Sequence, residues 1–202
     1  MKIPMPHTLI PCPSNRGKAS YALLLTFAVC SIAHGADSFT NLLSFHLLAD
    51  TAGWKSIIGS TGRLANVKLV PEPVLSDHDF VSYDTTNHIF VVTAEAAKRV
   101  SRKMMKRDTP SVTTRGEKVY HLDGPDTPFV LVVSGERTCF GVFSSPISSI
   151  AYSDPTIWGE HLVIPAESTN NFSFMISPYS SGEWPDQRKD SRFLAAVKKL
   201  SL

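Results

Sequence analysis

The chain has 202 residues, of which 43% are apolar and 19% are charged, a composition typical of a folded globular protein rather than a disordered one. The formal charge of +2 depends on the first 35 residues, which hold three bases and no acid. The rest of the chain has 17 basic and 18 acidic residues, a net charge of −1. A near-neutral domain gives no general reason to bind a polyanion, so we expect no nucleic-acid partner.

Residues 1–35 have the pattern of a secretory signal peptide. A basic segment ends near Lys18, an apolar segment covers Tyr21–Ile32, and small residues at Ala33 and Gly35 suit cleavage after Gly35. The apolar segment is short for a membrane span, which needs about 20 apolar residues. We therefore expect an exported protein, periplasmic or secreted. An uncleaved N-terminal anchor is the alternative, and the protein would be membrane-bound only in that case.

Cleavage would leave one cysteine, Cys139, because Cys12 and Cys30 precede the cleavage site. One cysteine cannot form an intramolecular disulfide, so the hydrophobic core must provide the stability. Cys139 lies among apolar residues of a predicted strand, which indicates a small buried side chain. A reactive thiol is the alternative, since Arg137 would share its face of the strand.

The first part of the mature domain predicts strands separated by turns. Strands are expected at 44–49, 66–70, 80–83 and 88–92, and Pro71 ends the second of them. The segment LSDHD at 75–79 is an acidic turn, and Asp84–Asn87 is a second turn, since Asp and Asn side chains bond their own backbone there.

A helix is expected over residues 94–106, with Thr93 as its N-cap and Glu95 favourably placed in its first turn. Ala97, Val100 and Met104 form its apolar stripe. The rest of its surface is basic, which indicates a solvated face. The alternative is a contact surface for an anionic partner such as lipid headgroups or a cell-wall polymer, with three candidate binding residues: Arg102, Lys103 and Lys106.

The strongest pattern is PFVLVVSGERTCFGVF at 128–143, which predicts a β-hairpin at the centre of the sheet. Apolar runs at 129–133 and 138–143 flank a polar break, and Gly135 suits the positive φ of a tight turn. The first run is apolar at every position, which indicates a strand covered on both faces or central in its sheet. Three residues of the tip are further candidate contact residues: Ser134, Glu136 and Arg137.

The remaining elements predict a single α+β domain over residues 36–202. A polar connection with a short strand at 118–122 precedes the hairpin, and alternating segments at 161–165 and 171–177 suit a second, half-buried hairpin. A final helix is expected at 192–200, capped by Asp190 or Ser191. We therefore expect a mainly antiparallel sheet with two helices packed on one face.

Two stretches resemble one known family. NHIFVVTAEAAKRVSRKM at 87–104 and PFVLVVSGERTCFGVFSSPIS at 128–148 resemble successive elements of the periplasmic P1 head of SecD, a subunit of the protein-export machinery. The likeness lies within residues 79–150. The chain also resembles a set of small exported bacterial proteins of unknown function that share this core. The resemblance implies a SecD-head-like fold and a substrate-contacting module, not an enzyme.

No catalytic or cofactor motif is present, and we expect no cofactor and no metal. The function expected is therefore a non-catalytic interaction module of the cell envelope that binds a protein partner or another envelope component. The alternative is a hydrolytic or metal-dependent enzyme, because carboxylates beside a His can bind metal or transfer protons. Its candidate residues are Asp77, His78, Asp79 and Asp84.

Overall fold

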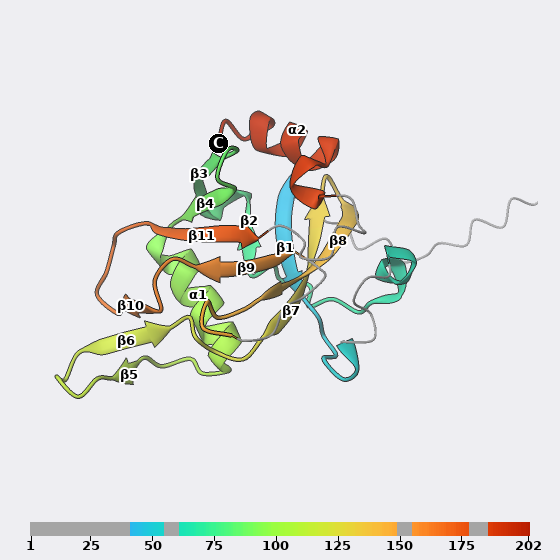
Figure 1. Ribbon diagram of the computed structural model, residues 1–202. Coiled ribbons are helices and arrows are strands. Elements are labelled where there is room, and N and C mark those ends of the chain that lie inside the picture. Colours follow the sequence, from blue (N-terminus) through green and yellow to red (C-terminus); the bar gives the residue numbers. More distant parts are fainter. Residues whose placement is uncertain (1–40, 55–60, 149–154, 178–185) are drawn as a thin grey trace, which may run out of the picture. The chain divides into compact units, whose positions relative to one another are not determined.

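An eight-stranded sheet carries the core of the molecule (Figure 1). The computed structural model describes residues 41–54, 61–148, 155–177 and 186–202, which belong to one compact unit. The strand order is β2-β1-β7-β8-β9-β11-β4-β3, and only the β8–β9 pair is parallel. The strands are β1 (Leu43–Leu47), β2 (Leu75–Ser76), β3 (Phe80–Asp84), β4 (Ile89–Val92), β7 (Thr127–Val133), β8 (Glu136–Phe143), β9 (Thr156–Gly159) and β11 (Phe172–Ser177).

The predicted central hairpin is confirmed. The strands β7 and β8 occupy the third and fourth places of the sheet and are joined by a two-residue turn. Ser134 and Gly135 form this turn with φ angles of 51° and 84°. Positive φ at both central positions matches the right-handed twist of the strands, which is why glycine is favoured here.

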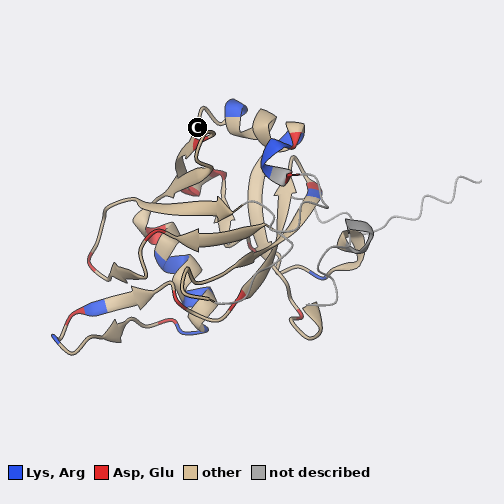
Figure 2. Cartoon of the chain, in the orientation of Figure 1, with Lys and Arg blue, Asp and Glu red and all other residues tan. Residues whose placement is uncertain are grey.

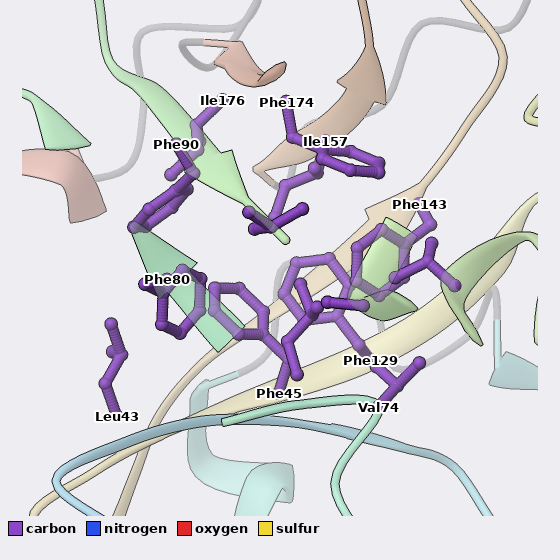
Figure 3. Packing of buried hydrophobic residues seen from close by; sticks show 14 of the residues in the cluster. Leu43, Phe45, Val74, Phe80, Phe90, Phe129, Phe143, Ile157, Phe174 and Ile176 are labelled. Atoms are coloured by element: carbon purple, nitrogen blue, oxygen red, sulfur yellow. The ribbon is translucent and has the colours of Figure 1, made fainter. Parts of the chain in front are cut away.

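Both faces of this hairpin are buried, as its continuous apolar pattern indicates. On the inner face, the ring of Phe45 lies 5.2 Å from that of Phe129 and 5.9 Å from that of Phe90. Figure 3 shows these rings pointing toward one another from strands on both halves of the sheet. On the outer face, Trp54 stacks on Phe140 at 6.1 Å, so the segment after β1 covers the side of the hairpin opposite the main core.

Two helices pack against the inner face, which agrees with the predicted α+β class. The helix α1 (Ala94–Met105) buries the predicted stripe of Ala97, Val100 and Met104, and α2 (Ser191–Lys199) buries Phe193 and Val197 in the same cluster. The expected caps are present, since the side chains of Thr93 and Asp190 accept hydrogen bonds from the first turns of α1 and α2. No helix of the described residues is long and apolar enough to cross a membrane.

A short segment connects the two edges of the large sheet. The edge strand β2 leads through the 3-10 helix η3 (Asp77–Asp79) directly into β3, the strand at the opposite edge. This connection requires the sheet to curl, and the curl explains why the Phe45 ring of β1 lies 5.9 Å from the Phe80 ring of β3. The inner face is therefore concave and encloses most of the aromatic side chains.

A second sheet of three short strands lies beside the large one and corrects one prediction. It has the order β10-β6-β5, with β5 (Ser111–Val112), β6 (Lys118–His121) and β10 (Val163–Pro165). The predicted hairpin of 161–165 with 171–177 is wrong, because β10 pairs with β6 whereas β11 pairs with β4 and β9. Alternation indicates which face of a strand is buried, but it does not select the strand's neighbour.

Two further predictions need correction. The expected strand at 66–70 is only one isolated bridge, Leu48 to Leu69, flanked by hydrogen bonds between residues 47–49 and 68–70. Pro71 removes the next backbone donor, and η2 (Thr61–Asn66) occupies the residues before it. Lys98 is not on a solvated face, because its side chain is 7% exposed and donates to Glu95 Oε1 at 2.9 Å. The predicted signal peptide at 1–35, with Cys12 and Cys30, lies outside the described residues.

Candidate functional site

A pocket opens between α2 and the concave face of the sheet. Its cavity volume is about 20 Å³, enough for about one water-sized molecule. Eight of its nine lining side chains are apolar, and the ninth is an arginine. The lining residues are Phe45, Phe129, Leu131, Cys139, Pro155, Ile157, Ile176, Arg188 and Phe193. The surface that faces the pocket is entirely apolar, so the pocket suits only a small apolar group.

The polar member of the lining, Arg188, is held in place by Asp186. Its Nε donates to Oδ1 at 2.7 Å and its Nη2 donates to Oδ2 at 2.8 Å, a bidentate pair on the 3-10 helix η4 (Gln187–Lys189) and the residue before it. The hydrogen bond from Arg188 holds the pKa of Asp186 below its usual range. The guanidinium is thus fixed by a carboxylate two residues away.

A tyrosine–histidine pair lies behind the same wall. The Tyr83 hydroxyl and His88 Nδ1 are 2.7 Å apart, and the Tyr83 ring meets the ring of Phe193 edge-on at 5.4 Å. Burial raises the pKa of Tyr83. Burial, followed by the positive charge of Arg188, lowers the pKa of His88. Both groups are therefore neutral at neutral pH, and they support α2 rather than add charge to the pocket.

Of the predicted hairpin-tip residues, one has a structural role and two are exposed. Arg137 holds the chain together, because its Nη1 donates to the carbonyls of Leu64 and Val67 at 2.7 and 2.6 Å. Glu136 is exposed and meets Arg192 of α2, with Oε2 3.2 Å from Nη1. Ser134 is exposed at the turn. The β7–β8 tip and α2 therefore lie next to each other (Figure 1).

The candidate residues of α1 also differ from one another. The guanidinium of Arg102 lies over the Tyr120 ring, 5.6 Å from its centroid. Lys106 ends the helix with a φ of 50°, and its backbone N–H bonds the carbonyls of Arg102 and Lys103. The side chains of Lys103 and Lys106 are exposed. The only acidic residue of α1 is Glu95 in its first turn, and Figure 2 shows the basic residues following it along the helix.

The acidic residues considered for catalysis bond the backbone at separate places. Asp77 accepts hydrogen bonds from the N–H groups of Leu42 and Leu43 at the start of β1. Asp79 accepts from Arg99 at 2.6 Å and from the N–H of Ser76 at 2.7 Å. These bonds hold together the connection between the two edges of the sheet.

Asp84 caps the β3–β4 turn by accepting from the N–H groups of Thr86 and Asn87, and His78 is exposed. In the part of the chain that the structure describes, no three His, Cys, Asp or Glu side chains are grouped to hold a metal ion. The four residues of the enzymatic alternative therefore do not share one site.

The sequence pattern could not reveal the pocket, because its lining residues range from position 45 to position 193. Each apolar member is indistinguishable in sequence from an ordinary core residue. The one local signal is the spacing of Asp186 and Arg188, which permits an ion pair but does not indicate what lies behind it. The sequence also places Tyr179 and Trp184 in a loop that could form a binding surface or pack against the domain, and both residues lie outside the described part of the chain.

Comparison with known proteins adds no family. No family model matches the chain, and no curated protein or solved structure is significantly similar to it. The functional interpretation therefore depends on the residues themselves.

Proposed function

We propose that the chain is an exported, non-catalytic interaction module of the cell envelope, with a core like the P1 head of SecD. It binds a protein or peptide partner at the end of the molecule formed by α2 and the β7–β8 tip. One observation carries the proposal: the apolar pocket opens beside α2. The likeness of residues 79–150 to a substrate-contacting head supports the same kind of function.

The exposed surface of α2 next to the pocket also favours this end. Leu194 is 37% exposed although it follows Phe193, which forms part of the pocket wall. Glu136 and Arg192 add a pair of exposed charges between the tip and the helix. An apolar centre with a polar rim is the usual composition of a protein-binding surface.

Affinity capture from a cell-envelope extract tests the proposal. The immobilised chain is compared with Leu194→Asp on α2 and with Val112→Asp, a matched control on β5, far from α2 in Figure 1. We expect the same protein to be retained by the wild type and by Val112→Asp and to be lost from Leu194→Asp. Equal retention by all three would place the contact elsewhere. Recovery of the chain only in the cytoplasmic fraction would contradict export.

A further inference from the structure

Positive charge is concentrated in residues 102–118, at the end of α1 and along the β5–β6 hairpin (Figure 2). This segment has six basic and two acidic residues, a net charge of +4, although residues 36–202 together carry −1. Its bases are Arg102, Lys103, Lys106, Arg107, Arg115 and Lys118. In the part of the chain that the structure describes, none of the six forms an ion pair with a carboxylate. The fold therefore leaves this charge without a partner.

The helix and the hairpin present part of this charge on a common face. Arg102 lies over the ring of Tyr120, and Lys118 is two residues from Tyr120 on β6, so both strand residues point to the side of α1. Val112 of β5 lies directly opposite Lys118 and shares that face. Lys106 follows Arg102 by four residues and lies on the same side of the helix.

We propose that this basic surface, residues 102–118, binds an anionic phospholipid membrane. The basic side chains meet the headgroups, and Val112, which is 66% exposed, enters the boundary with the acyl chains. A membrane offers phosphates to the bases and an apolar layer to the valine, whereas a soluble polyanion offers only the charges. The surface is separate from the α2 end, so the inference does not depend on the proposed function.

Binding of the full chain to vesicles tests the role of the charge. Mixed vesicles contain equal parts of phosphatidylglycerol and phosphatidylcholine, and residues 1–35 are common to every variant. Lys106→Gln combined with Lys118→Gln should weaken binding about thirtyfold, or about fivefold for each base removed near an anionic surface. The matched control, Lys198→Gln with Lys199→Gln on exposed positions of α2, should stay within about twofold, because attraction to the headgroups fades beyond a Debye length. Equal weakening in both variants would overturn the inference.

A polarity-sensitive dye on Val112→Cys reports whether the hairpin enters the membrane. Cys12 and Cys30 are replaced by serine and Cys139 is buried, so the dye attaches at position 112. We expect its emission to shift to the blue with the mixed vesicles and to stay constant with phosphatidylcholine alone. The same dye on Leu194→Cys of α2 should show no shift. Unchanged emission from position 112 with the mixed vesicles would overturn the insertion.

The outcomes separate this inference from the proposed function. Val112→Asp should weaken binding to the mixed vesicles at least about fivefold and still retain the protein partner, whereas Leu194→Asp should do the reverse. Binding to dextran sulfate without binding to the mixed vesicles would indicate a soluble polyanion and overturn the membrane assignment. Vesicle binding by a chain that captures no envelope protein would support this inference and contradict the proposed function.

Discussion

Two hairpins of this protein use similar turn glycines and have opposite surroundings. Gly135 joins β7 to β8 with a φ of 84°, and Gly116 lies between β5 and β6 with a φ of 83°. The first hairpin has seven- and eight-residue strands buried on both faces. The second has a two-residue strand with Val112 66% exposed. Turn chemistry thus permits a hairpin, whereas burial determines how long and how stable it is.

The largest expected effect is in the core of the first hairpin. Phe129 is 1% exposed, and its ring lies 4.7 Å from that of Phe143. Phe129→Ala should lower the free energy of unfolding by about 3–5 kcal/mol, because it leaves a cavity against the central ring cluster. Urea unfolding measures the loss. Val112→Ala on the second hairpin is the control and should change stability by less than about 0.5 kcal/mol. Similar losses in both variants would contradict the contrast.

A smaller effect is expected where the hairpin holds the segment that covers its outer face. Arg137→Met keeps the apolar stem but removes the hydrogen bonds to the carbonyls of Leu64 and Val67. The loss should be about 2 kcal/mol, since the donor is charged and the carbonyls would lose it as a partner. The fluorescence of Trp54, which packs below this segment, should shift toward that of an exposed indole. An unchanged unfolding midpoint would show that the hydrogen bonds from Arg137 do not stabilise the fold.

Substitutions at the two turn glycines test whether the β7–β8 and β5–β6 hairpins differ in stability. Alanine is strained at positive φ, so Gly135→Ala should cost about 1 kcal/mol of global stability. Gly116→Ala should cost less than about 0.5 kcal/mol in the same urea titration, because Gly116 is exposed and follows the two-residue strand β5. Hydrogen exchange should instead show faster opening of β5 and β6 alone. Equal global losses would mean that the two hairpins unfold as one unit.

The smallest expected effect concerns pH. Because the pKa of His88 is lowered in the folded protein, the unfolded chain binds more protons near the ordinary histidine pKa of about 6.5. The contribution of neutral His88 to the free energy of unfolding is present above that pH and is lost as the pH falls through the folded-state pKa. His88→Gln should therefore reduce the decrease in stability between pH 7.5 and pH 5. Parallel stability curves for the two proteins would contradict the assignment.

The sequence was most informative where several local signals coincided. The double-sided apolar run, the turn glycine and the capped helices predicted the centre of the fold, and these elements lie where expected. Ser111–Val112 is too short to show a strand pattern, so β5 was missed. Alternation at 171–177 indicated a buried face but not the neighbours β4 and β9, because strand order depends on contacts far apart in the chain.

The candidate site was less predictable than the fold for a physical reason. Surface roles assigned from charge ignored partners that only folding provides, such as the carbonyls of Leu64 and Val67 for Arg137. The pocket depends on the shape left between distant residues, which no local pattern records. The same curling of the sheet that brings Phe45 to Phe80 also places α2 over the concave face.

The most direct test of the proposed binding end is photo-crosslinking in cells at two positions, one on α2 and one on the β5–β6 hairpin. A photoreactive phenylalanine analogue replaces Leu194 of α2 in one strain and Val112 on the second hairpin in another, both at exposed positions. We expect a discrete crosslinked partner from position 194 and none from position 112. A partner crosslinked at position 112 and absent at position 194 would contradict the assignment of the binding end.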